Sequence, residues 1–146
     1  MSHKYLLLKA LIAAVIVSAA GGGEASEYIE ARLETNLMPG PVEYSVLLPD
    51  GYGPRAEPFP LLLLLHGGGG SAAQLQRMQP RLDKLWQDGD LPKMVIASPT
   101  VPTGRIYMDF KNGEEKQESF IVDQFLNHVR DNYNVSKDRR KTMISG

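Results

Sequence analysis

The stretch LLLLLHGGGGS, residues 61–71, decides the fold of this chain of 146 residues. Its five leucines are apolar on every face, which is typical of a strand covered on both sides in a parallel sheet. The four glycines after His66 predict a loop with almost no side chains, in which backbone N–H groups stay accessible. Accessible N–H groups can bind an oxyanion, so this stretch indicates acyl-transfer chemistry.

The glycine loop has two other interpretations. One is an ordinary flexible turn between a strand and a helix. The other is a phosphate-binding loop, but this needs the G-x-x-x-x-G-K-[ST] pattern, and no lysine follows within the loop. The sequence therefore leaves open an oxyanion loop of the H-G-G-G type and a plain turn.

The neighbouring segments predict an α/β sheet. Polar and apolar residues alternate over residues 28–35 and over residues 42–48. We therefore expect an antiparallel hairpin in which residues 28–35 form an edge strand. Two more buried strands are expected at 93–97 and 142–144, separated from residues 61–65 and from each other by helical segments. This order predicts an α/β fold whose strands are parallel, with crossover helices, after an antiparallel start.

Two helices are expected in the crossovers. Pro80 interrupts the helix-like residues 71–87, which predicts two helical pieces there. Residues 118–133 have an amphipathic pattern, with Val122 assigned to the apolar face. Ser71 and Ser119 lie where these helices begin, and N-capping is the simplest role for both.

Residues 1–25 have the pattern of a signal peptide. Lys4 and Lys9 precede or flank an apolar run over residues 10–20, and small residues follow. A membrane anchor is the alternative, but the run is shorter than the roughly 20 residues that a spanning helix needs. We therefore expect a secreted or periplasmic protein with no stable membrane span after cleavage. The absence of cysteine excludes a lipoprotein linkage and disulfides.

Charge and histidine content exclude several classes of partner. The formal net charge is −1, which gives no electrostatic reason to expect nucleic acid. The three histidines, His3, His66 and His128, are too scattered to match the spacing of a metal site. No metal or organic cofactor is therefore expected, and His128 is assigned a structural role.

The final residues, Met143 to Gly146, look like a strand that leads into a G-x-S-x-G nucleophile elbow. Gly146 would be the first glycine of that elbow. A strand that merely ends in Ser-Gly is the alternative. The position favours the elbow, because it follows the glycine loop by one strand and one long helix. We therefore expect residues 26–146 to be the N-terminal part of a hydrolase domain, truncated at the elbow.

Taken together, the motifs resemble the esterase D branch of the α/β-hydrolases, which includes feruloyl and acetyl-xylan esterases and secreted mycolyltransferases. The resemblance covers nearly all of the chain after the signal segment and implies an α/β-hydrolase fold. The matching segments are residues 44–49 with 51–52, 60–71, 107–109, 118–120, 132–135 and 139–146.

The resemblance also implies roles for individual residues. The oxyanion donors fall on the backbone N–H of Gly68 and on that of Gly69, together with that of the residue after the nucleophile. His66 and Gly67 are expected to order the loop, since in the family's chain order the catalytic histidine follows the elbow. Asp109 is a candidate for the loop that contacts the substrate, and a turn aspartate that caps its own backbone is the alternative.

The family order places serine, acid and histidine beyond Gly146, so no catalytic residue is expected within this chain. The implied activity is that of a serine ester hydrolase acting on a small-molecule or polysaccharide-linked extracellular ester or thioester through a Ser-His-Asp mechanism. The 146 residues by themselves are then expected to be inactive. A catalytically inert hydrolase or binding module and an acyltransferase of the mycolyltransferase type are the alternatives. The oligomeric state is left open.

Overall fold

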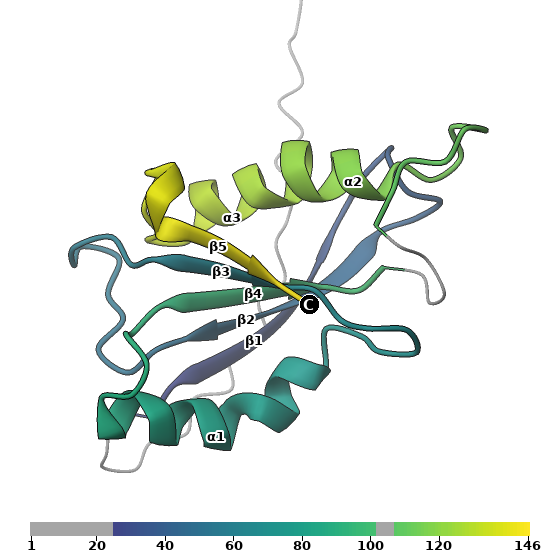
Figure 1. Cartoon of the computed structure of the whole chain (residues 1–146). Coiled ribbons are helices and arrows are strands. Elements are labelled where there is room, and N and C mark those ends of the chain that lie inside the picture. Colours follow the sequence, from purple (N-terminus) through teal and green to yellow (C-terminus); the bar gives the residue numbers. More distant parts are fainter. Residues whose placement is uncertain (1–24, 102–106) are drawn as a thin grey trace, which may run out of the picture.

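A single mixed sheet forms the centre of the molecule in the computed structural model, which describes residues 25–101 and 107–146. The predicted signal peptide, residues 1–25, lies outside this part of the chain except for its last residue. The strand order is β1-β2-β4-β3-β5, with helices on both faces (Figure 1). The strands are β1 (Glu27–Leu33), β2 (Val42–Leu48), β3 (Leu61–Leu64), β4 (Val95–Pro99) and β5 (Thr142–Ser145).

The pairing of the strands confirms the predicted topology. Strands β1 and β2 form an antiparallel hairpin in which Glu27 lies opposite Leu48. Strand β4 is antiparallel to β2 and parallel to β3, and β3 is parallel to β5. The strands β3, β4 and β5 therefore end at the same edge of the sheet.

Helical segments form both crossovers between the parallel strands. The first crossover is one helix, and the second is a continuous run of three helical segments followed by a short 3-10 turn. These are α1 (Gln74–Asp88), then α2 (Gln117–Ser119), the π-helical η1 (Phe120–Phe125) and α3 (Leu126–Asn132), and then η2 (Arg139–Lys141).

The leucine run is covered on both faces of the sheet, as its composition predicts. Leu61 and Leu63 belong to the apolar cluster beneath η1 and α3. Leu62 and Leu64 pack against the cluster beneath α1. Alternate side chains of one strand thus join both cores, which fixes β3 between the helical layers.

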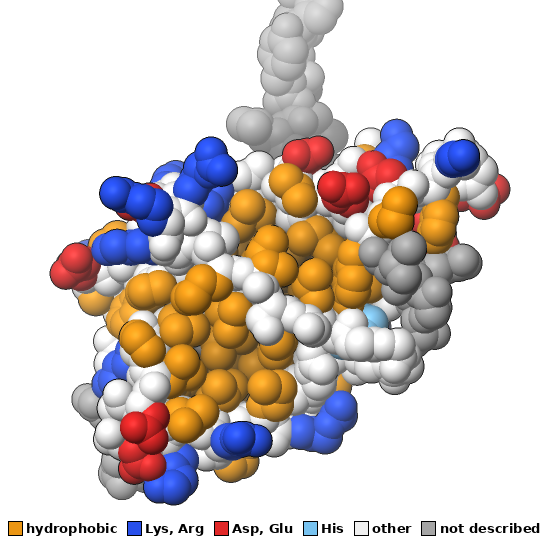
Figure 2. All heavy atoms as spheres, in the orientation of Figure 1, with side chains coloured by type: hydrophobic (Ala, Val, Ile, Leu, Met, Phe, Trp, Pro, Cys, Tyr) orange, Lys and Arg blue, Asp and Glu red, His pale blue; other side chains and the backbone are white. Residues whose placement is uncertain are grey.

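The β5 side of the sheet is the more open one. Met143 and Ile144 are 42% and 60% exposed. Figure 2 shows apolar side chains gathered over this side of the molecule. Strand β5 is an edge strand, as β1 is.

The prediction of two helical pieces at residues 71–87 is wrong, because α1 is a single helix that contains Pro80. Proline removes one N–H donor from the helix interior, which is a local cost. Leu75 before Pro80 and Leu82 after it are both buried against the sheet. We infer that this burial on both sides of the proline keeps the helix continuous.

The second helical segment, residues 117–132, begins and ends within one residue of the predicted range 118–133. Its exposed face, however, differs from the predicted one. Val122, assigned to the apolar face, is 50% exposed, and Phe120 is fully buried instead. In η1 the backbone bonds join residues five apart, as Leu126 N–H to Ile121 O shows. This wider turn brings Phe120 and Phe125 onto one face, with their rings stacked at 5.9 Å.

Both predicted N-caps are wrong. The N-cap positions are Ala73 for α1 and Lys116 for α2, and neither side chain caps its helix. Ser71 lies before the first helix, where its carbonyl accepts the Gln74 N–H. Ser119 lies inside the first turn of its helix.

The strand predicted at 93–97 is shifted by two residues to Val95–Pro99. Lys93 precedes the strand and pairs with Asp50 at 2.6 Å. Pro99 is itself paired, opposite Tyr44, and is the last residue of the strand. Proline is tolerated at such a position, where no further ladder bond needs its N–H.

Candidate functional site

The candidate site lies where the three parallel strands end. The loop that follows β3 contains the four glycines, and the backbone after β4 runs beside it: the Ala72 N–H donates to Thr100 Oγ1 at 2.9 Å. In α/β sheets, ligands bind at the carboxyl ends of the strands. Figure 1 shows the end of β5, marked C, beside the loop that leaves β3.

The glycine loop forms a closed turn. The Gly70 N–H donates to the Gly67 carbonyl at 3.0 Å. Gly69 has a φ of 75°, which a type II turn requires at its third residue and which favours glycine. Gly68 and Gly69 therefore form the tip of the turn, and both are exposed.

His66 holds the base of this turn. Its ring is buried, and its Nε2 lies 3.0 Å from the Val101 N. A backbone N–H can only donate, so Nε2 is the acceptor and the proton lies on Nδ1. Nδ1 then donates to the Gly67 carbonyl at 2.9 Å, the same oxygen that closes the turn. This is the geometry that a loop-ordering role for His66 and Gly67 requires.

Tyr107 fixes the same histidine from the other side. Its hydroxyl donates to the His66 carbonyl, and the two rings meet edge-on at 6.0 Å. Its φ of 55° lies in the left-handed region, which is uncommon for a residue with a side chain. Burial raises the pKa of the Tyr107 hydroxyl, which keeps it protonated as a donor.

Tyr107 belongs to the segment 107–109 that carries the family resemblance, but its sequence context assigns it no role. No local pattern connects it to His66, which lies 41 residues earlier. The only sequence signal that could have identified Tyr107 is an aromatic hydroxyl donor in a loop that is expected near the mouth of the site.

The N–H groups of Gly68 and Gly69 form no hydrogen bond with any residue that the structure describes. A Cβ added at Gly67 or Gly68 would meet no atom within 4 Å. Space and donors therefore coincide at the tip of the turn. Two such donors on a fixed turn can stabilise negative charge on a carbonyl oxygen.

Gly146 lies in close contact with the start of the glycine loop. The Leu65 N–H donates to the Ser145 carbonyl at 2.7 Å, which extends the β3–β5 pairing. A Cβ at position 146 would lie 3.1 Å from Leu65 Cβ and 3.2 Å from its carbonyl oxygen. Glycine is thus the residue that fits this close approach. That Gly146 begins a nucleophile elbow stays a prediction.

Asp109 is bound to the second helical segment. Its carboxylate accepts the Ser119 N–H at 3.0 Å and the Ser119 hydroxyl at 2.5 Å. The hydrogen bonds from Ser119 hold the pKa of Asp109 below its ordinary value. Asp109 thereby satisfies an N–H in the first turn of the helix, where acceptors are otherwise missing. Contact with a substrate stays a prediction.

His128 lies apart from the glycine loop, on α3. Its Nε2 and the Tyr44 hydroxyl are 2.8 Å apart, and burial lowers the pKa of this imidazole. The site residues brought together by the fold are therefore His66 and Tyr107 with the four glycines.

Neither a metal centre nor a membrane span is found in the described part of the chain. Residues 25–101 and 107–146 contain no group of three or more histidine, cysteine or acidic side chains placed to hold a metal ion. Within the same ranges, no helix combines the length and apolar character that crossing a bilayer requires.

Comparisons by sequence gave no match. No protein-family model matches the chain, and no curated protein does.

Solved structures do match. A ferulic acid esterase is 24% identical over 83% of this chain and 48% of its own, with a TM-score of 0.74. The ferulic acid esterase of Anaeromyces mucronatus is 17% identical over 93% of this chain and 55% of its own, with a TM-score of 0.66. The fluorophosphonate-binding serine hydrolase F of Staphylococcus aureus is 18% identical over 82% of this chain and 46% of its own, with a TM-score of 0.67.

These structures share one architecture with this chain, which spans about half of their length. The chain therefore has the α/β-hydrolase fold over the part that it covers, as predicted from residues 61–71 and their surroundings.

Proposed function

We propose that this chain belongs to a serine ester hydrolase and supplies its oxyanion-binding half. The observation that carries the proposal is the pair of N–H groups of the exposed residues Gly68 and Gly69, which no described residue uses. They stand on a turn held by two hydrogen bonds to the Gly67 carbonyl. The likeness in fold to ferulic acid esterases and to a serine hydrolase supports the same conclusion.

In this mechanism a serine oxygen attacks the carbonyl carbon of the ester, and a histidine takes the serine proton. The carbonyl oxygen then becomes an oxyanion, and the N–H groups of Gly68 and Gly69 donate to it. Loss of one donor of this kind typically costs about 3 kcal/mol of transition-state stabilisation. The serine is expected two positions beyond Gly146, in a G-x-S-x-G elbow, with the acid and the histidine after it.

His66 is not the base in this mechanism. The lone pair on Nε2 already accepts the Val101 N–H, and the Nδ1 proton already binds the Gly67 carbonyl. Both nitrogens are thus used inside the protein. His66 acts on the reaction only by fixing the turn that carries the donors.

The compartment and the substrate follow from the proposed export. A signal peptide over residues 1–25 places the enzyme in the periplasm or outside the cell, where polysaccharide-linked esters and small esters occur. Asp109 is proposed to order the loop that faces such a substrate, because its bonds to Ser119 fix the residues next to Tyr107.

The direct test uses the longest protein that contains this chain. It should hydrolyse p-nitrophenyl butyrate and react with a fluorophosphonate at one serine beyond residue 146. A product that is only free acid, with or without a sugar acceptor, supports hydrolysis. An acyl-sugar product would instead show an acyltransferase. Absence of both labelling and turnover in a folded protein would favour an inert or binding function.

A further inference from the structure

An open groove begins beside the glycine loop. It has a volume of about 480 Å³, which is the size of a small-molecule site. Gly70 and Val101 line it, and Val101 is the residue whose N–H binds His66. The groove therefore reaches the residue that directly follows Gly69 in the glycine loop. Thr100 lines it as well. The remaining walls come from β1, β2 and the connection between them, including Met38, Pro39, Gly40, Pro41 and Val42.

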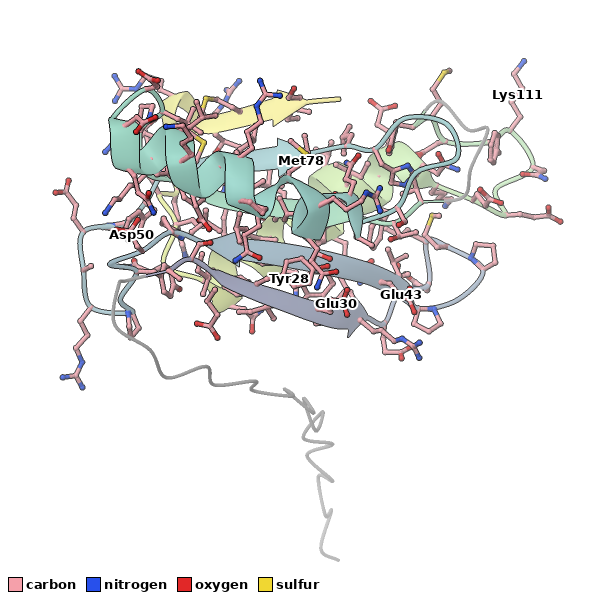
Figure 3. The ribbon with its side chains drawn as sticks, turned by 90° about the horizontal axis from the view of Figure 1, so that it is seen from below. Tyr28, Glu30, Glu43, Asp50, Met78 and Lys111 are labelled. Atoms are coloured by element: carbon pink, nitrogen blue, oxygen red, sulfur yellow. The ribbon has the colours of Figure 1, made fainter. Side chains whose placement is uncertain are left out.

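The walls of the groove are mainly apolar. Met38, Val42 and Val101 are each less than 7% exposed, so they form a packed floor. The charged side chains that line the groove, Arg32 and Glu43, are paired with each other at 2.8 Å. Figure 3 shows Glu43 toward one end of the molecule and Asp50 toward the other. An uncharged apolar group therefore fits this groove better than a charged one.

The connection that forms the groove wall is held in place by the second helical segment. Thr35 Oγ1 donates to Gln124 Oε1, and Gln124 Nε2 donates to the Glu34 carbonyl at 3.0 Å. The Lys116 N–H donates to the Leu37 carbonyl at 2.8 Å. Gln124 belongs to the π-helical turn η1. A wall fixed in this way is preformed, which lowers the entropic cost of binding.

We propose that this groove binds the apolar acyl group of the ester, namely the group bonded directly to the carbonyl carbon that lies over Gly68 and Gly69. The groove starts at Gly70, next to those donors, so a directly bonded group reaches it first. The inference rests on the proposed function and adds the chemical class of the substrate: esters of uncharged, apolar acids. It also assigns Gly40, Val42 and Val101 to acyl-group selection.

The test is an NMR titration of the full chain with two phosphonates. Methylphosphonate presents only the anionic head group, and butylphosphonate adds an apolar chain. Both should shift the amide signals of Gly68 and Gly69. Butylphosphonate alone should shift the methyl signals of Val42 and Val101, and should bind about tenfold more tightly or better, because its added methylene groups leave water.

Gly40→Phe provides the matching variant. A Cβ at position 40 meets no atom within 4 Å, and the φ of Gly40 lies outside the left-handed region, so a side chain there causes no backbone strain. Because Gly40 lines the groove, we expect the ring to fill part of it. This variant should lose the extra affinity for butylphosphonate and keep that for methylphosphonate. Gly53→Phe is the control, since its Cβ has only ordinary contacts and lies outside the groove. Both variants should melt at the wild-type temperature.

Each result decides between the two proposals. Equal affinities for the two phosphonates, with glycine signals that shift and valine signals that do not, would overturn the acyl groove and leave the oxyanion site standing. The same follows if Gly40→Phe, folded as the wild type, binds butylphosphonate as tightly. If neither compound shifts Gly68 or Gly69, the proposed function fails, and the acyl groove fails with it.

Discussion

The two parts of the glycine loop differ in how tightly they are packed. At its base, a Cβ at Gly70 would lie 2.9 Å from His66 Cβ, and both nitrogens of His66 are bonded. At its tip, Gly68 and Gly69 are exposed, and their N–H groups bind no described residue. Four identical residues in sequence therefore do two different things: some let the backbone pack, and others leave donors and space for a ligand.

This difference explains how a loop of glycines can be a precise site. Glycine alone makes a chain flexible, and a flexible N–H donor stabilises a developing charge less well than a fixed one. Here the base of the loop is fixed by contacts from Val101, two residues after β4, and from Tyr107. Fixed donors need no reorganisation when charge develops on a substrate, which is the condition for strong electrostatic catalysis.

The largest effect is expected from His66→Ala, which removes the support of the base. The substitution leaves the buried Val101 N–H without its acceptor and opens a cavity. The free energy of unfolding should fall by roughly 2–4 kcal/mol in urea denaturation. His66→Gln, which can still accept a hydrogen bond, should recover part of this loss. Wild-type stability in His66→Ala would show that the base is not what holds the turn.

Gly70→Ala and Gly67→Ala compare tight and open glycines directly. The added methyl at position 70 clashes with His66, so the free energy of unfolding should fall by about 1–3 kcal/mol. At position 67 the methyl meets nothing within 4 Å, and the change should stay within about 0.5 kcal/mol. Equal losses for the two variants would contradict the distinction between tightly packed and open glycines within the loop.

Tyr107→Phe tests the second support of the base with a smaller effect. The ring contact with His66 is kept and the hydrogen bond to its carbonyl is lost, so stability should fall by about 1 kcal/mol. Amide hydrogen exchange should also become faster at Val101, whose N–H depends on the His66 ring. Unchanged exchange at Val101 would mean that Tyr107 does not position this histidine.

Asp109→Ala should have the smallest effect, and the effect should depend on pH. The folded-state pKa of Asp109 is lowered by its bonds to Ser119, so its contribution is present above the ordinary value of 3.8. It is lost as the pH falls through the lower folded-state pKa. The stability difference between wild type and variant should therefore shrink between about pH 6 and about pH 2.5. A difference that grows over this range would mean that the bonds to Ser119 do not favour the charged carboxylate.

Much of the fold follows from local sequence pattern. The leucine run predicts a strand covered on both faces because its composition alone requires two apolar neighbours. The alternating residues of β1 and β2 predict the hairpin for the same kind of reason. Features that depend on tertiary packing could not be predicted from local pattern. Burial on both sides of Pro80 keeps α1 whole, and the π-helical turn places Phe120 in the core while Val122 is exposed.

The site was predictable only in part. The positions of Gly68, Gly69 and His66 in an H-G-G-G pattern mark the loop, since glycines after a buried strand are a local signal. The hydrogen bonds of Tyr107 and Asp109 depend on loops brought together by the fold. The apolar groove likewise joins residues 32–43 to residues 70 and 100–101, which are distant in sequence.

The central claim is that the N–H groups at the tip of the loop bind an oxyanion, and Gly68→Pro against Gly68→Ala tests it most directly. Position 68 is the second residue of a type II turn, where proline fits and removes only the N–H. Alanine keeps the N–H and has open space.

The measurement is the dissociation constant of methylphosphonate for each variant, followed at the Gly69 amide signal. The alanine variant should bind within about twofold of the wild type, and the proline variant should bind about tenfold more weakly or worse, because a hydrogen bond to a charged group is lost. Equal binding by the two folded variants would contradict a role for the Gly68 N–H in holding the oxyanion.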